Sequence, residues 1–193
     1  MEIGDVAVRI GEIAPDFEQD TTNGSIRFHE WMSRSWCILF SQPMDFTSTS
    51  TMELSAAARL RPQWVRCGVK VVALSVDSPD GHARWEKAIA ETEGLALNFP
   101  VIADTDRTVS ALYDMVPPDS DPSEIVRRIH VIDPDKRIRL MRTYPPATAY
   151  NFEAILRAVE GLQLADARLL DARLLDAKVS DMLPGAGISN VLH

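Results

Sequence analysis

The chain has 193 residues, of which 46% are hydrophobic and 25% are charged. This length and composition predict a globular fold with a substantial core. The formal net charge of −8 disfavours a broad surface for nucleic acid or anionic membranes, so neither is expected as a partner. No run of about 18 apolar residues occurs and the N-terminal residues do not fit a signal peptide, so we expect a cytoplasmic protein.

The first part of the chain alternates between strand-like and helix-like segments. Gly24 marks a turn between two weak strands, and the apolar run at residues 36–40 predicts a buried central strand. Residues 51–61 are rich in alanine and predict a helix that Pro62 kinks or ends. Glu53 is expected in the first turn of that helix, where negative charge suits the helix dipole.

The alternation continues to a last helix. We expect strands at 69–77 and 99–103, helices at 79–93 and 107–113, and a hairpin with strands at 127–133 and 136–142. Asn151 can cap a final helix that runs to about Leu164. This order predicts an α/β fold in which a central mixed sheet carries helices on both faces.

The tail differs in character from the rest. Asp-Ala-Arg-Leu-Leu occurs at residues 166–170 and again at 171–175, and Asp-Ala-Lys-Val follows at 176–179. A five-residue repeat is too short to be a solenoid unit. We therefore expect one domain at residues 1–164 and a C-terminal arm at 165–193, either helical or loosely packed.

The most informative segment follows the central strand. Residues 41–54 read Ser-Gln-Pro-Met-Asp-Phe-Thr-Ser-Thr-Ser-Thr-Met-Glu-Leu. Peroxiredoxins carry Pro-X-X-X-Thr-X-X-Cys at this point, and Pro43, Thr47 and Ser50 match that spacing with serine in the place of cysteine. Together with several further ordered matches, this makes the chain resemble the one-cysteine peroxiredoxins over residues 10 to 164.

The resemblance implies a thioredoxin-like fold of the peroxiredoxin type and a homodimer. It implies a catalytic set and a substrate-binding set of residues: Ser50, Thr47 and Arg127 in the first, and Gln42, Pro43 and Tyr150 in the second. Two members depart from the family, since Gln42 stands where it has a histidine and Tyr150 where it has a second arginine.

The chemistry of the family depends on sulfur. A thiolate forms at a helix N-terminus because the helix dipole and an arginine lower the thiol pKa, and it reduces hydroperoxides while becoming a sulfenic acid. A serine hydroxyl is not ionised at neutral pH and has no sulfenic acid step. We therefore expect Ser50 to abolish the peroxidase activity of this site.

Three functions remain open at this point. The pocket could have left peroxide chemistry and bind a small organic molecule, or catalyse a non-redox step on it. The chain could be a non-catalytic regulatory or binding dimer. It could also be a thiol-dependent hydroperoxide reductase that carries a Cys-to-Ser change, although further departures at Gln42, Ser48, Thr49 and Tyr150 favour natural divergence.

Several of these residues also have plain structural interpretations. Ser50 and Thr47 can serve as hydroxyls that satisfy a helix start, and Arg127 can be an ordinary arginine at a strand end. Cys37, in the central strand, is expected to be a buried core thiol, and Cys67 to be inert. The histidines lack metal-ligand spacing and no glycine-rich phosphate loop occurs, so no metal and no cofactor are expected.

Overall fold

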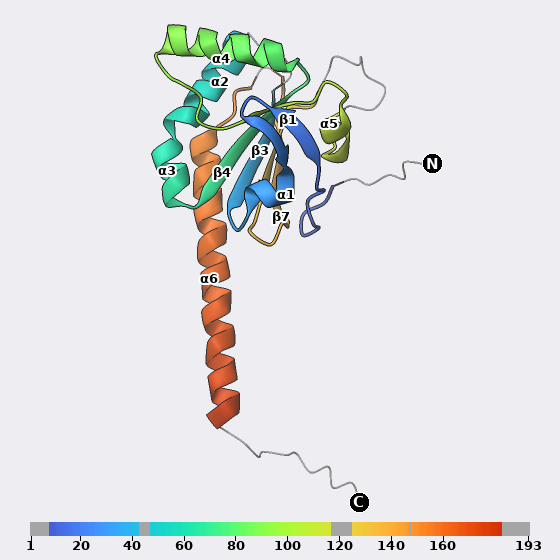
Figure 1. Cartoon of the computed structure of the whole chain (residues 1–193). Helices are drawn as coiled ribbons and strands as arrows, with labels where there is room; N and C mark the ends of the chain where they lie inside the picture. The colour runs from blue at the N-terminus through green and yellow to red at the C-terminus, as the bar shows by residue number, and fades with distance from the viewer. Residues whose placement is uncertain (1–7, 43–46, 117–124, 147, 183–193) are drawn as a thin grey trace, which may run out of the picture. The chain divides into compact units, whose positions relative to one another are not determined.

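The computed structural model of the chain describes residues 8–42, 47–116, 125–146 and 148–182, with side chains described as far as residue 175. The chain divides into two compact units, Met1–Leu156 and Arg157–His193. One helix runs through this division (Figure 1). The expected boundary after residue 164 stays a prediction.

The first unit is built on a mixed seven-stranded sheet with the order β2-β1-β5-β4-β3-β6-β7. Its strands are β1 (Glu18–Thr21), β2 (Gly24–Arg27), β3 (Trp36–Gln42), β4 (Val69–Ser75), β5 (Val101–Ala103), β6 (Arg128–Ile132) and β7 (Ile138–Thr143). The three central strands β5, β4 and β3 run parallel, and the flanking strands pair antiparallel. The predicted mixed sheet and the predicted hairpin are both confirmed.

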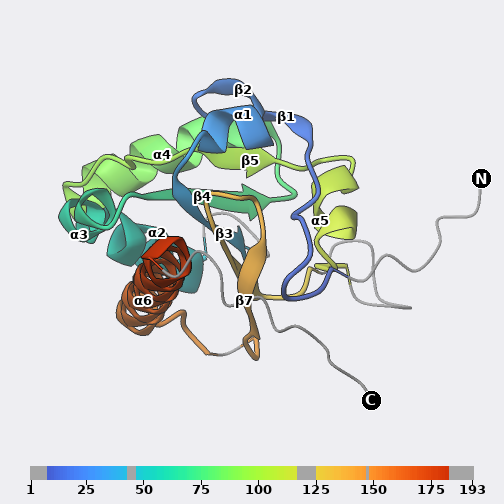
Figure 2. The same ribbon diagram turned by 90° about the horizontal axis from the view of Figure 1, so that it is seen from below.

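Helices cover both faces of this sheet. They are α1 (Phe28–Met32), α2 (Ser48–Arg59), α3 (Arg61–Arg66), α4 (Pro79–Glu93) and α5 (Thr108–Leu112). Helix α6 (Phe152–Met182) follows in the sequence and passes into the second unit. Figure 2 shows α2 and α3 on the opposite side of the central strands from α5. Strand β3 is buried along its whole length because side chains from both layers pack on it.

The two faces of β3 have different neighbours. Cys37 and Leu39 belong to an apolar cluster that includes residues of α1 and α5. Phe40 points to the other face, where its ring packs against Tyr150 at 5.6 Å and Phe152 at 5.0 Å between centroids. Successive residues of a strand face opposite sides, so this alternation follows directly from the extended backbone.

Local sequence explains where several helices begin and end. Helix α4 starts after Ser78, whose hydroxyl accepts a hydrogen bond from the Gly81 N–H at 3.2 Å, and it ends at Gly94 with φ of 61°. Its predicted bounds are confirmed. Helix α2 ends before Leu60, and Pro62 lies in the first turn of α3, where its missing N–H costs no hydrogen bond.

Two expectations about helices are wrong. Glu53 lies beyond the first turn of α2, and its carboxylate faces buried partners rather than the helix dipole. Helix α6 does not end near Leu164 but continues through the repeat to Met182. The repeat contains alanine, leucine and arginine, which are strong helix formers, and no glycine or proline that would stop the helix.

Candidate active site at the start of helix α2

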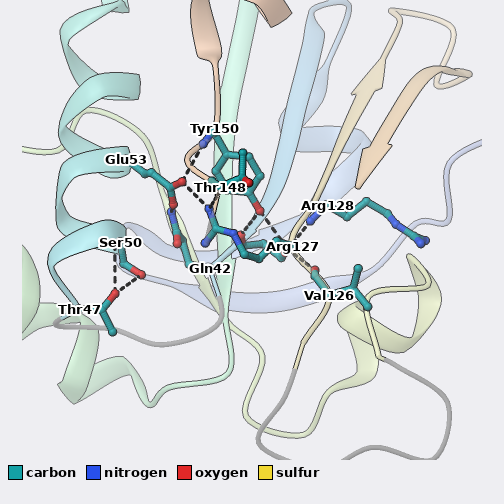
Figure 3. Close-up of polar contacts among 10 residues, drawn as sticks. Gln42, Thr47, Ser50, Glu53, Val126, Arg127, Arg128, Thr148 and Tyr150 are labelled. Atoms are coloured by element: carbon teal, nitrogen blue, oxygen red, sulfur yellow. Dashed lines mark hydrogen bonds and ion pairs between the residues drawn. The ribbon is translucent and has the colours of Figure 1, made fainter. Parts of the chain in front are cut away.

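Two hydroxyl groups lie together where α2 begins. The Thr47 side chain caps the helix, because its Oγ1 accepts a hydrogen bond from the Ser50 N–H at 3.1 Å. The same hydroxyl donates to the Ser50 Oγ at 2.7 Å (Figure 3). Ser50 is only 2% exposed and Thr47 is half-buried, so the Ser50 hydroxyl is held in a buried position at the positive end of a helix.

One turn further along α2, the Glu53 carboxylate accepts hydrogen bonds from three buried residues. Its Oε1 accepts hydrogen bonds from the Arg127 guanidinium and from the Tyr150 N–H at 2.8 Å. Its Oε2 accepts a hydrogen bond from Gln42 Nε2 at 3.0 Å. Residues three apart lie on the same face of a helix, so Glu53 and Ser50 face the same side of α2. Glu53 thereby connects α2 with β3, β6 and the loop before α6.

Arg127 is fixed from several sides just before β6. Its guanidinium forms an ion pair with Glu53, and both side chains are almost fully buried, with exposed fractions of 5% and 3%. Its Nη2 also donates to the Thr148 carbonyl at 3.3 Å. The Arg127 Cζ lies 4.5 Å from the centroid of the Tyr150 ring. A buried charge is stable only with such compensation, and the carboxylate and the ring provide it here.

Tyr150 is anchored at both ends. Its N–H binds Glu53, and its hydroxyl donates to the Ser41 carbonyl at 2.6 Å. Burial raises the pKa of the Tyr150 hydroxyl, which therefore stays protonated and acts as a donor. The position that holds a second arginine in the resembled family thus contributes a neutral ring and a neutral hydroxyl to this site.

The structure brings most of the expected site residues into one region (Figure 3). Thr47 and Ser50 bind each other, whereas Gln42, Arg127 and Tyr150 are joined through Glu53. Pro43, the remaining expected substrate-binding residue, lies outside the described residues.

Sequence reasoning missed two residues of this region. The sequence suggests only a helix-dipole role for Glu53, although its place three residues after Ser50 on one helix is a usable signal. Thr148 contributes only its backbone carbonyl, and no side-chain pattern could have identified it. The site is therefore held by a buried carboxylate whose role was not expected.

Two polar atoms in this cluster remain unsatisfied within the described part of the chain. They are the Gln42 Oε1 acceptor and the Arg127 Nε donor, and both are buried. Buried polar atoms normally have partners, so an unsatisfied acceptor and donor in one cluster are compatible with a small ligand or a water bound there.

Both cysteines lie away from the start of α2 in the fold, in β3 and at the end of α3. Cys37 is fully buried in β3, and burial raises the pKa of its thiol far above the usual range, which disfavours a reactive thiolate. Cys67 lies at the C-terminal cap of α3, and the expectation that it is inert stays a prediction. Among the described residues, no group of three or more metal-ligating side chains comes together.

This fold, with a polar site at the start of α2 facing a buried arginine, defines a peroxiredoxin scaffold. The AhpC/TSA family pattern matches residues 10–141, and the chain belongs to this family. The expected fold class is thereby confirmed. No helix within the described ranges has the length and apolar character needed to cross a membrane.

The similar proteins include one-cysteine members of the family. The chain is 42% identical over 159 residues to a 1-Cys peroxiredoxin of Dictyostelium discoideum, covering 82% of this chain and 66% of the relative. It is 43% identical over 163 residues to peroxiredoxin-6 of Gallus gallus, covering 80% and 73%. It is 42% identical over 190 residues to the mitochondrial peroxiredoxin PRX1 of Saccharomyces cerevisiae, covering 95% and 73%.

Solved structures agree with these relatives. A yeast mitochondrial 1-Cys peroxiredoxin superposes with a TM-score of 0.76 at 40% identity, covering 83% of this chain and 78% of that one. A cysteine-to-serine mutant of peroxiredoxin 6 from Arenicola marina superposes with a TM-score of 0.77 at 37% identity, covering 83% and 76%.

Proposed function

We propose that this chain carries the substrate site of a thiol-dependent hydroperoxide reductase, with Ser50 in the place of the peroxide-reducing cysteine. In this form the site binds a hydroperoxide without reducing it, and a cysteine at position 50 makes it a peroxidase. The observation that carries the proposal is the 2.7 Å hydrogen bond from Thr47 to the buried Ser50, which lies on the same face of α2 as Glu53 and its bound arginine.

The residues around position 50 support each step of the peroxidase reaction, and only the sulfur atom that would react is missing. A thiolate at position 50 would accept the hydrogen bond that Ser50 now accepts from Thr47, which would lower the thiol pKa together with the α2 dipole. It would attack one peroxide oxygen, the O–O bond would break, and the other oxygen would leave as water or an alcohol after taking a proton. The thiolate would become a sulfenic acid, which an external thiol reduces.

The names of the relatives support this reading over an unrelated non-redox step. The Dictyostelium, chicken and yeast relatives are all named as peroxiredoxins. The retained Thr47 and Arg127 are the residues that orient a peroxide in the resembled family. A site redesigned for unrelated chemistry has no evident reason to keep Thr47 bonded to Ser50 and Arg127 buried against Glu53.

A second candidate function is the binding of another small polar molecule. The unsatisfied Gln42 Oε1 and Arg127 Nε, counted among the described residues, support it because one atom accepts and the other donates a hydrogen bond. An alcohol or an amide that raises the melting temperature of the chain, with no rise from a hydroperoxide of the same shape, would favour this function.

We propose a homodimer, as the family resemblance implies, and sedimentation velocity measures this directly. We also propose a cytoplasmic location, although the yeast relative is named as mitochondrial, and fractionation of the native host tests which compartment holds the chain.

A peroxide consumption assay with dithiothreitol tests the proposed function. The chain and Ser50→Ala should consume tert-butyl hydroperoxide at the rate of buffer, and Ser50→Cys should consume it catalytically. Ser50→Cys/Arg127→Met is the matched control, because it restores the sulfur but removes the guanidinium. Equal rates for Ser50→Cys and this control would overturn the proposal.

A further inference from the structure

Near its end, strand β3 passes the backbone that carries the buried guanidinium of the site. The antiparallel pairing of β3 with β6 runs as far as Phe40 and Ile129. The next residue of β3, Ser41, is fully buried, and its hydroxyl contacts the backbone of Val126 and Arg128. A side chain therefore continues the contact between the two segments where their backbone pairing ends.

The Ser41 hydroxyl binds the backbone on both sides of Arg127, at the labelled neighbours Val126 and Arg128 (Figure 3). It donates to the Val126 carbonyl at 2.6 Å and accepts a hydrogen bond from the Arg128 N–H at 2.9 Å. These two groups belong to the two peptide planes that flank the Arg127 Cα. Peptide planes are rigid and rotate only about the bonds to Cα. Holding both planes therefore fixes the direction in which the Arg127 side chain leaves the backbone.

Tyr150 connects the two ends of this arrangement. Its hydroxyl donates to the Ser41 carbonyl at 2.6 Å, whereas its ring centroid lies 4.5 Å from the Arg127 Cζ. The Arg127 carbonyl in turn accepts a hydrogen bond from the Tyr144 N–H at 2.8 Å. Arg127 is thus held at its backbone by Ser41 and Tyr144, and at its guanidinium by Tyr150 and Glu53.

We propose that Ser41 is a positioning residue of this site, which orients the Arg127 guanidinium through its two backbone hydrogen bonds. This role rests on the proposed function, because it concerns the reaction that a cysteine at position 50 would perform. A charged group stabilises a breaking O–O bond best when it is already in place, since it then needs no reorganisation during the reaction. An arginine whose flanking peptide planes can rotate loses part of this advantage.

A kinetic double-mutant cycle in the Ser50→Cys chain tests whether Ser41 acts through Arg127. Ser41→Ala should lower the second-order rate constant of oxidation by tert-butyl hydroperoxide about tenfold, because the guanidinium is no longer held in place. In Ser50→Cys/Arg127→Met, Ser41→Ala should have no further effect, since the guanidinium that it orients is absent. A loss that came only from a less stable fold would be the same in both backgrounds.

Hydrogen exchange supplies a measurement that needs no peroxidase activity. In the parent chain, nuclear magnetic resonance can follow the exchange of the Arg128 N–H and of the Arg127 guanidinium protons with solvent. Ser41→Ala should accelerate both at least about tenfold, and Ser41→Thr, which keeps a hydroxyl, should preserve slow exchange. Ser110→Ala is the matched control and should leave both unchanged, since it removes a fully buried hydroxyl that binds the Arg107 carbonyl beside α5.

Four results would each overturn the proposal. They are unchanged exchange of the Arg127 guanidinium in Ser41→Ala, exchange as fast in Ser110→Ala, exchange as fast in Ser41→Thr, and a rate loss that persists in the Arg127→Met background. Oxidation of Ser50→Cys at the rate of a free thiol would instead contradict the proposed function. The exchange of the Arg127 protons would then still decide whether Ser41 positions Arg127.

Discussion

The Arg127 guanidinium lies over the ring of Tyr150, with 4.5 Å between the Arg127 Cζ and the ring centroid. This stack sits where the resembled family has a second arginine, so one cation and one neutral ring replace two cations. Glu53 balances the remaining charge through its ion pair with Arg127. The ion pair and the neutral ring therefore leave this cluster with little net charge.

Removing the Tyr150 hydroxyl should destabilise the fold. Tyr150→Phe keeps the ring over Arg127 but loses the hydrogen bond to the Ser41 carbonyl, at a cost of about 1–2 kcal/mol in the free energy of unfolding. Tyr144→Phe is the control, because the buried Tyr144 hydroxyl has no partner among the described residues. Urea unfolding should leave Tyr144→Phe within about 0.5 kcal/mol of the parent. Equal losses in both variants would argue against the structural role of the Tyr150 hydroxyl.

Glu53 should be the most sensitive position of the site. Glu53→Leu leaves the Arg127 charge buried without its ion pair. This should lower the free energy of unfolding by about 3–5 kcal/mol. Glu53→Leu/Arg127→Met removes both charges and should recover part of that loss. Chemical unfolding of the two variants measures the difference. A double variant no more stable than the single one would show that the ion pair is not the source of the loss.

Much of this fold could be predicted from the sequence, but the buried contacts of Glu53 could not. Local signals such as Ser78 and Gly94 set the bounds of α4, because caps and left-handed glycines act within one turn. The Gln42–Glu53 hydrogen bond joins residues eleven apart through the β3–α2 connection. No helix or strand periodicity predicts such a contact, and it emerges only when β3, β6 and α2 are packed together.

The end of α6 could not be predicted for a different reason. The repeat favours a helix at every position, but helices of this kind usually need tertiary packing, which a sequence pattern does not show. Asn151 was a reliable signal for the start, since its side chain accepts a hydrogen bond from the Ala154 N–H at 2.9 Å. The repeat contains no comparable stop signal.

The stability of the fold should fall as the pH falls below about 6.5, in part because of His130. The pKa of His130 is lowered from 6.5 to about 3, mainly by burial and also by the charge of Arg128, while Asp114 opposes this effect. Between pH 6.5 and pH 3, His130 therefore binds a proton in the unfolded chain but not in the folded chain. Unfolding is favoured as the pH drops through this range. Above pH 6.5 neither state holds the proton, and the penalty disappears.

His130→Phe should remove this pH dependence, because the position is buried beside the ring of Tyr113 and can accept an aromatic group. The free energy of unfolding of the variant, relative to that of the parent, should be about 2 kcal/mol higher at pH 5 than at pH 7.5. Urea unfolding at the two pH values measures it, with His29→Gln, at a partly exposed histidine, as a control. Parallel pH profiles for His130→Phe and the parent would rule out a buried neutral His130.

Thr47 should matter both for stability and for the chemistry restored by a cysteine. Thr47→Val removes the cap of α2 and should cost about 1 kcal/mol, whereas Thr47→Ser keeps a hydroxyl and most of the stability. In the Ser50→Cys chain, Thr47→Val also removes a hydrogen-bond donor to position 50 and should raise the thiol pKa. Absorbance of the thiolate against pH measures this shift, and an unchanged thiol pKa would mean that Thr47 does not contact the sulfur.

The rate at which a cysteine at position 50 is oxidised tests the central claim most directly. The reaction of Ser50→Cys with tert-butyl hydroperoxide can be followed by stopped-flow fluorescence, since Trp85 donates a hydrogen bond to Thr51 beside this position. A preserved peroxide site predicts a second-order rate constant at least about 100-fold above that of a free thiol, with one oxygen gained on the introduced sulfur by mass spectrometry. A rate constant equal to that of a free thiol would contradict the account.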